Sequence, residues 1–275
     1  MYVSCSGLCC DKSNYPTAED AIVKIGELGF GATDLAVMEN WQHINPSEIS
    51  ESQPALSLCL KESLSKSDLT VSSLNCNLGV PWSDTGSEAN TERANRFAAV
   101  LDLATGLSSP NITLSPPSQS REKQPVEELL SILIDWMLQA SEKASEAGVS
   151  LSAEAHANTI IEDPEVAIRF AEALPPSAGI TYDPSHFELQ GIPLRETEPL
   201  LDHARHVHVR NSSLKNMQES MEAGTVDFDW LIPALRSHGY DGPVAIEYFN
   251  GFDPDFSTTA ALRDHLLQLG VSSRP

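Results

Sequence analysis

Short apolar runs alternate with longer helical patterns along the whole chain, and this alternation limits the fold more than any other feature. Eight runs have the length and β-branched content of strands, at 2–7, 31–37, 69–75, 111–115, 149–156, 178–186, 204–211 and 243–250. Helical patterns separate them, at 17–29, 47–67, 90–107, 125–148, 163–174, 194–203 and 227–238. Such an alternation predicts parallel strands that are joined by helices.

The number of strand–helix units decides between two architectures. Eight strands with helices between them match a (β/α)8 TIM barrel, and 275 residues are close to the ~250 that are usual for that fold. An open doubly wound sheet would normally carry a glycine-rich first turn, and the segment SGLCCDKSNYP has none. The Ser/Pro-rich stretch 115–125 is expected to be one long loop. We predict a single TIM-barrel domain over residues 1–275.

The charge balance excludes several kinds of partner. Thirty-nine acidic and seventeen basic residues give a formal net charge of −22, which repels nucleic acids and anionic membrane surfaces. The sequence also indicates where the protein is located. No run is apolar enough to cross a membrane, and the first residues lack the pattern of a signal peptide.

Five cysteines without a spaced CxxC pair fit reduced thiols. We therefore expect no nucleic-acid or membrane partner and a cytoplasmic location.

Polar side chains stand at the ends of four consecutive strands, where barrel enzymes carry their chemistry. They are Glu154 and His156 in AEAH, Asp183 and His186 in YDPSH, His208 and Arg210 in HVHVRN, and Glu247 in IEYFN. Charges next to Val, Ile and Ala are costly to bury unless they are paired or bound to a metal. Three carboxylates and one imidazole at one point would suit Mn²⁺, Mg²⁺ or Co²⁺ better than structural zinc.

The HVHVRN segment alternates between polar and apolar side chains. His206, His208 and Arg210 share one face of the expected strand, and a barrel strand is covered on both sides, so this face points into the barrel. We expect His206 to lie deeper as a hydrogen-bonded interior residue and Arg210 to lie nearer the mouth. Asp34 and Asn75 could also reach the pocket, although capping and turn roles explain them equally well.

Five phrases resemble the sugar isomerase/epimerase superfamily of xylose-isomerase-like barrels, with D-tagatose 3-epimerases, hydroxypyruvate isomerases and dehydroshikimate dehydratases as relatives. In order they are ELGFGATDL, SEAGVSLSAEAH, GITYDPSH, HVHVRN and GTVDFDWLIPALRSHGYDGPVAIE, and they cover nearly the whole chain. Asn211 stands where the superfamily often has Asp. The resemblance implies a TIM barrel and one divalent metal ion, with Zn²⁺ as a further candidate beside Mn²⁺, Mg²⁺ and Co²⁺.

The resemblance also implies roles for individual residues. The metal ligands would be Glu154, Asp183, His208 and Glu247. Glu154 and Glu247 would in addition be the acid/base pair, and His186 would contact the substrate.

Three more residues are assigned to the substrate by their position and charge. His156 comes two residues after Glu154, so it is expected to share the same strand face and to bind substrate. Arg210 and Lys215 are candidates for orienting a substrate hydroxyl, carboxylate or phosphate.

These roles predict an isomerase or epimerase that acts on a small keto-sugar or polyhydroxy keto acid through a metal-stabilised enediolate. A dehydroshikimate dehydratase-like lyase is the alternative, because EAHANT (154–159) and HVRNSS (208–213) resemble that branch. A non-catalytic sugar-binding barrel is a third class. An endonuclease-IV-like enzyme would need further ligands on the early strands, where only Asp34 and the distant His43 stand. Dimers are common among similar enzymes, so a homodimer is one expected form of the protein.

Overall fold

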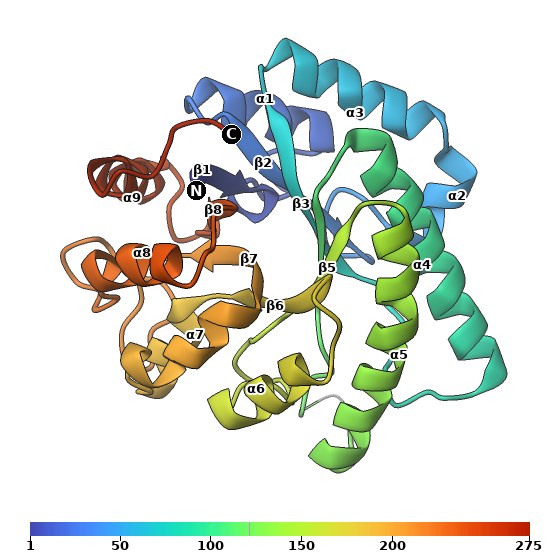
Figure 1. Cartoon of the computed structure of the whole chain (residues 1–275). Coiled ribbons are helices and arrows are strands. Elements are labelled where there is room, and N and C mark those ends of the chain that lie inside the picture. The colour runs from blue at the N-terminus through green and yellow to red at the C-terminus, as the bar shows by residue number, and fades with distance from the viewer. Residues whose placement is uncertain (121) are drawn as a thin grey trace.

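Eight parallel strands close into a barrel in sequence order, β1 to β8, with helices around the outside (Figure 1). The structure is a computed structural model that describes residues 1–120 and 122–275, so Arg121 of the expected loop lies outside the described residues. The strands are β1 (Tyr2–Ser6), β2 (Ala32–Met38), β3 (Thr70–Asn77), β4 (Asn111–Leu114), β5 (Ser150–Glu154), β6 (Ala178–Tyr182), β7 (Ala204–Val209) and β8 (Pro243–Ile246). The predicted (β/α)8 barrel is confirmed.

The helices follow the strands in alternation. The α-helices are α1 (Ala18–Glu27), α2 (Ile49–Ser52), α3 (Ala55–Lys66), α4 (Ser87–Leu107), α5 (Val126–Glu146), α6 (Pro164–Glu172), α7 (Pro184–Gln190), α8 (Phe228–Ser237) and α9 (Ser257–Gln268). The 3-10 helices are η1 (Gly7–Cys9), η2 (Pro46–Glu48) and η3 (Leu194–His203). Within the described part of the chain, no helix has the length and apolar character that a membrane span requires.

Prolines explain two places where the predicted elements were wrong. The single helix expected at 47–67 is divided into η2, α2 and α3, because Gln53 is extended before Pro54, a residue without an N–H donor. The strand expected at 178–186 stops at Tyr182, since Pro184 begins α7 after Asp183 has capped it. His186 therefore lies on a helix and not on a strand.

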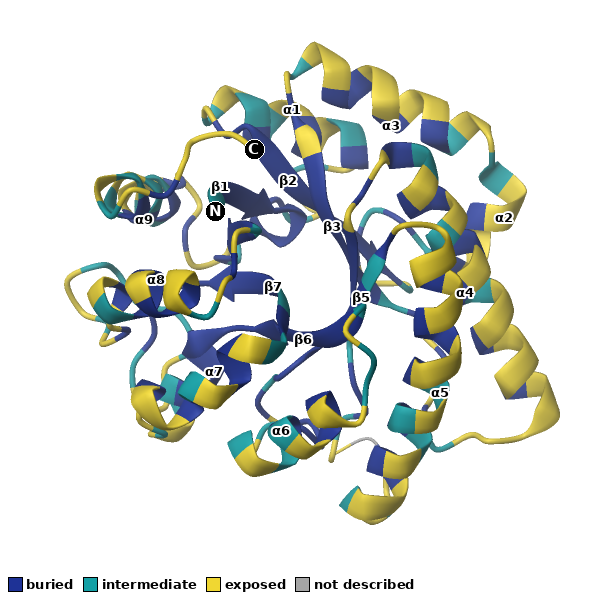
Figure 2. Ribbon diagram, in the orientation of Figure 1, coloured by how far each residue is buried: buried dark blue, intermediate teal, exposed yellow. Residues whose placement is uncertain are grey.

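The barrel wall has an apolar outer face and a polar inner one. Figure 2 shows the strands buried and the surrounding helices exposed on their outer sides. Outward side chains such as Val3, Ile112 and Leu151 join the apolar core beneath the helices. Inside the barrel a hydroxyl network links β3 to β6, and its buried members are Ser73, Asn111, Thr113, Ser152 and Thr181. This interior differs from the branched apolar filling that is usual in TIM barrels.

A β-bulge interrupts the pairing of β2 with β3. Thr33 pairs with Val71 and Asp34 pairs with Ser73, so Ser72 has no partner on β2. The bulge turns two consecutive serines inward. The hydroxyl of Ser72 donates to Asp34 Oδ1 at 2.5 Å, and the hydroxyl of Ser73 lies 3.2 Å from Thr113 Oγ1.

Candidate active site

The polar residues predicted from the strand ends converge at one end of the barrel. Glu154 is the last residue of β5, Asp183 follows β6, His208 lies in β7 and Glu247 follows β8. We call the buried group around them the charged cluster; its members are Asp34, Glu154, Asp183, His186, His206, His208, Arg210 and Glu247. The parallel order of the strands brings residues 34 and 247 into one site.

Two of the four predicted metal ligands, Glu154 and Glu247, face an imidazole nitrogen of a third, His208. His208 Nδ1 lies 3.1 Å from Glu154 Oε1 and 3.6 Å from Glu247 Oε1. The ligand atoms of these three residues all lie within 4.8 Å of one another. Ser6 Oγ and Asn75 Nδ2 also donate to Glu247 Oε1, at 3.0 and 3.1 Å. Asn75 thus reaches the site, and both contacts fix the orientation of the Glu247 carboxylate.

Arg210 connects Asp183, the fourth predicted ligand, to Glu247. Its Nη2 lies 2.8 Å from Asp183 Oδ2 and 3.1 Å from Glu247 Oε2, and its Nε donates to Ser185 Oγ. The side chain is only 2% exposed. In this position the guanidinium is an internal counterion of the charged cluster, whereas the sequence suggested a substrate-binding residue near the mouth.

Two histidines, His156 and the cluster member His186, lie beside Glu154. The rings of His156 and His186 lie against each other at an interplanar angle of 40°, with centroids 3.7 Å apart, and His186 Nε2 lies 3.7 Å from Glu154 Oε1. His156 follows the end of β5, so the reason given for its orientation, a shared strand face, was wrong. It nevertheless reaches the same site as Glu154.

A cavity of about 710 Å³ opens beside His156. Glu154 and His156 line it, together with residues from the loops after β3 and β4, among them Trp82, Ser118 and Glu122. The Glu122 carboxylate accepts hydrogen bonds from the backbone of Trp82 and of the next residue, at 2.8 and 2.9 Å, which links the two loops. The volume suits a sugar-sized ligand.

Lys215 lies apart from this cavity. Its side chain is exposed on the loop after β7, and its backbone N–H donates to Leu189 O at 3.0 Å. Lys215 is absent from the described lining of the cavity, so its predicted contact with substrate would require a movement of the loop.

Burial and charge shift the two glutamates in opposite directions. Burial raises the pKa of Glu154, but the imidazoles of His186 and His208 outweigh burial and hold this pKa well below its usual value. Burial raises the pKa of Glu247, and it stays above its usual value because burial and the carboxylates of Glu154 and Asp183 outweigh the opposite effect of His208 and Arg210. Glu154 is therefore the more readily ionised carboxyl and Glu247 the more readily protonated one.

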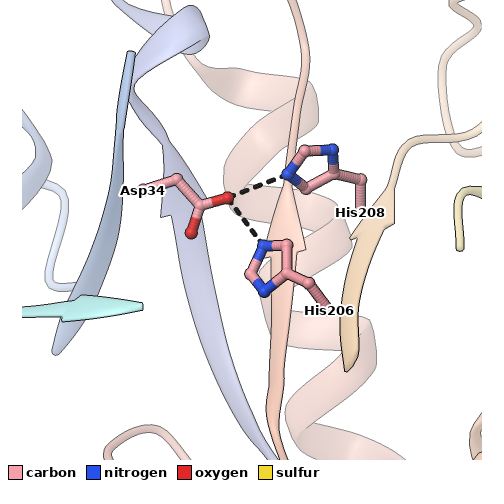
Figure 3. Close-up of side chains that lie close together, drawn as sticks. All are labelled: Asp34, His206 and His208. Carbon is pink, nitrogen blue, oxygen red and sulfur yellow. Dashed lines mark hydrogen bonds and ion pairs between the residues drawn. The ribbon is translucent and has the colours of Figure 1, made fainter. Parts of the chain in front are cut away.

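Asp34 is the cluster member whose role the sequence left undecided. It is fully buried, and its Oδ2 lies 2.7 Å from His206 Nε2 and 2.9 Å from His208 Nε2 (Figure 3). His206 is thus the hydrogen-bonded interior residue that was predicted. A signal for Asp34 was present in the sequence, because an acidic residue in the apolar run GATDLAV needs buried partners.

The donor set of the charged cluster fits a divalent cation. Asp34, Glu154, Asp183 and Glu247 are all buried, whereas the permanent positive charge among them is the single guanidinium of Arg210. Burial lowers the pKa of His208, but Glu247, Asp34 and Glu154 outweigh burial and raise it well above its usual value. The carboxylates thus attract positive charge to the position of His208 Nδ1, and carboxylate oxygens with one imidazole are ligands for such an ion.

Comparisons with known proteins agree with this architecture. A family model described as a xylose isomerase-like TIM barrel matches residues 22–268. A ketose 3-epimerase from Arthrobacter globiformis is 31% identical over 126 residues, a match that covers 42% of this chain and 42% of that protein. The chain therefore aligns with less than half of the length of that relative.

Two solved structures have the same fold over nearly their whole length. A xylose isomerase-like TIM barrel protein from Mycobacterium smegmatis in complex with magnesium is 17% identical, with 100% of this chain and 98% of that chain covered and a TM-score of 0.77. The probable 3-DHS dehydratase AsbF from Bacillus anthracis is 14% identical, with 97% and 99% covered and a TM-score of 0.74. At these identities the likeness is one of fold.

Proposed function

The chain belongs to the xylose isomerase-like TIM barrel family, and on this basis we propose that it is a divalent-metal-dependent isomerase or epimerase of keto-sugars. The excess of buried carboxylates in the charged cluster is the observation that carries the proposal. Glu154, Asp183, His208 and Glu247 would hold the ion. The partial match to a ketose 3-epimerase supports the reaction class.

A divalent cation in this cluster would polarise the carbonyl of a bound keto-sugar and stabilise the negative charge of an enediolate. Glu154 lines the cavity and is the more readily ionised carboxyl, so we assign to it the removal of the proton from carbon. Glu247 returns a proton. Its delivery to the opposite face of the same carbon gives epimerisation, and its delivery to the neighbouring carbon gives isomerisation.

The surroundings of Glu154 support a small polyhydroxy substrate. His156 lines the cavity with Glu154, and the buried His186 lies 3.7 Å from the Glu154 carboxylate. We assign both histidines to the hydroxyl groups of the substrate. Hydroxyl side chains such as Ser118 and Thr159 line the same cavity, together with Trp82. Because the donors of Arg210 already face Asp183, Glu247 and Ser185, we assign this residue to the cluster rather than to the substrate.

The test is solvent exchange at carbon in the metal-loaded protein. A panel of ketoses is incubated in D₂O with Mn²⁺-loaded protein, and NMR follows both deuterium incorporation and new sugar isomers. We expect exchange and interconversion for at least one ketose, and loss of both in Glu154→Gln. Binding of a ketose without exchange would favour a non-catalytic barrel.

The lyase alternative is measured in the same preparation. The structural likeness to a probable 3-DHS dehydratase is the reason to include dehydroshikimate. Formation of a catechol acid, followed by its absorbance, without ketose exchange would replace the isomerase proposal. The five free cysteines fit a reducing compartment, and we therefore propose a cytoplasmic location. We also propose that the protein forms a homodimer.

A further inference from the structure

One carboxylate oxygen below the predicted metal ligands accepts two imidazole N–H groups. Asp34 Oδ2 faces His206 Nε2 at 2.7 Å and His208 Nε2 at 2.9 Å, and all three side chains are fully buried (Figure 3). An ionised carboxylate can only accept hydrogen bonds, so each of these two nitrogens must carry a proton. Because Nε2 of His208 carries a proton and donates it to Asp34, this nitrogen is not free to coordinate a metal ion.

The other oxygen of Asp34 is also held. Ser72 donates to Oδ1 at 2.5 Å, and the Ser72 hydroxyl lies 2.5 Å from Ser4 Oγ. Ser72 is the unpaired residue of the bulge on β3, so the strand departs from regular pairing at the point where it reaches Asp34. Contacts to both oxygens fix the carboxylate, and the carboxylate in turn fixes the ring of His208.

We propose that Asp34 is a positioning residue that presents His208 Nδ1 to the metal ion. The proposal rests on the metal site of the proposed function. With Nε2–H donated to Asp34, the lone pair available on a neutral His208 is at Nδ1, the atom that lies 3.1 Å from Glu154 Oε1 and 3.6 Å from Glu247 Oε1. A ring turned by 180° about the Cβ–Cγ bond would place Cδ2 at the glutamates and Cε1 at Asp34, so both contacts would be lost.

A rival arrangement uses the same three residues as a second ligand set. The ligand atoms of Asp34, His206 and His208 lie within 4.8 Å of one another and could in principle hold an ion themselves. Their nitrogen–oxygen distances are those of hydrogen bonds already made, which argues for a support below the ligands. The two arrangements differ in what His206 does. A ligand would be essential for metal binding, whereas a second donor to Asp34 would not.

The experiment measures Mn²⁺ affinity of the full chain by calorimetry in four variants. For Asp34→Ala we expect an affinity loss of about 10-fold to 100-fold, as for other groups that orient a metal-binding histidine. Asp34→Asn should lose less, because its amide oxygen can face the imidazoles while its NH₂ donates to Ser72. His206→Gln should lose less than Asp34→Ala. Ser152→Ala, in the hydroxyl network, is the matched control and should keep the wild-type affinity.

A second measurement reads the coordinating nitrogen without activity. Long-range ¹H–¹⁵N NMR spectra of the Zn²⁺-loaded protein should show His208 with a proton on Nε2 and the metal on Nδ1. A metal on Nε2 overturns the proposal, and so does an Asp34→Ala variant that folds and binds Mn²⁺ like the wild type. If Asp34→Ala does not fold, a wild-type affinity in Asp34→Asn together with Zn²⁺ on Nε2 overturns it.

The two proposals fail in different ways. Wild-type protein that binds no Mn²⁺ overturns the metal site and the role of Asp34 together. Wild-type binding with unchanged affinity in Asp34→Ala overturns only the role of Asp34. A loss in His206→Gln as large as in Asp34→Ala would indicate that the ion is held by Asp34, His206 and His208, and would also overturn the positioning role.

Discussion

The hydroxyl network and the charged cluster fill neighbouring parts of one barrel. Both bury polar groups, but they differ in whether those groups find enough partners within the protein. In the hydroxyl network, neutral groups satisfy one another, as between Ser152 Oγ and Thr181 Oγ1 at 2.7 Å. The charged cluster has more buried carboxylates than fixed cations. The comparison shows that a polar interior alone does not indicate a site. Unbalanced buried charge does, because it needs an outside partner.

The largest effect should follow the removal of a carboxylate from the cluster. Glu247→Gln is expected to lower turnover by about 10²-fold to 10⁴-fold, since the amide cannot donate or accept the transferred proton. Ketose exchange in metal-saturated protein measures the loss, and Ser152→Ala is the neutral control with activity close to wild type. Near-normal turnover in Glu247→Gln would remove this residue from the acid/base pair.

The next effect concerns the internal counterion. Arg210→Met should lower the free energy of unfolding by about 3–5 kcal/mol, because Asp183 and Glu247 are left buried without their cation. Urea unfolding of the metal-free protein measures the change. Arg205→Met is a matched control on the same strand, where the guanidinium is half-exposed and bonds to backbone oxygens. Equal losses in the two variants would contradict the counterion role.

A smaller effect is expected within the hydroxyl network. Ser152→Ala should lower the free energy of unfolding by about 1–3 kcal/mol, since Thr181 Oγ1 and Asn111 Nδ2 each lose a partner. Mn²⁺ affinity should not change. A weaker affinity with unchanged stability would mean that the two polar regions are coupled and that the comparison is wrong.

The smallest effect is a pH dependence of stability that we expect in the charged cluster but not in the hydroxyl network. Burial raises the pKa of Asp34, but His206 and His208 outweigh burial and hold it below the ordinary value of 3.8. A lowered pKa contributes stability that is present above pH 3.8 and is lost as the pH falls below it. The stability difference between wild type and Asp34→Asn should therefore shrink by about 1 kcal/mol between pH 5 and pH 3.

The control for this pH series is Ser152→Ala, a variant of the neutral hydroxyl network. The stability difference between wild type and Ser152→Ala should stay constant over the same range, because a serine hydroxyl does not titrate there. Thermal unfolding of the three metal-free proteins at several pH values gives both differences. A constant difference for Asp34→Asn would show that the carboxylate is not stabilised by its imidazole partners.

The strand order and the convergence of the site could be predicted because each depends on a local pattern. The eight apolar runs define the barrel, and the alternation in HVHVRN correctly places His206 and His208 on the inner face. Glu154 and Glu247 follow from the strand ends. Their roles as ligands and as acid/base pair remain predictions, which the variants above test.

What the sequence left open depends on partners that lie far apart along the chain. Arg210 reads as a cation near the mouth, and only the position of Asp183 and Glu247 in the fold reveals it as their counterion. Asp34 reads as a capping residue until His206 and His208, more than 170 positions later, are brought to it. The bulge at Ser72 breaks the two-residue period, so alternation alone cannot assign the inward residues of β3.

The same bulge has an evolutionary consequence. β2 contributes seven residues to the barrel and β3 contributes eight, and Ser72 is the residue without a partner. Loss of that single codon would leave two strands of equal length with regular pairing, and Asp34 would lose its hydroxyl donor. The hydroxyl contact of Asp34 could therefore be gained or lost in one mutational step, while the contacts of Asp34 with His206 and His208 involve its other oxygen.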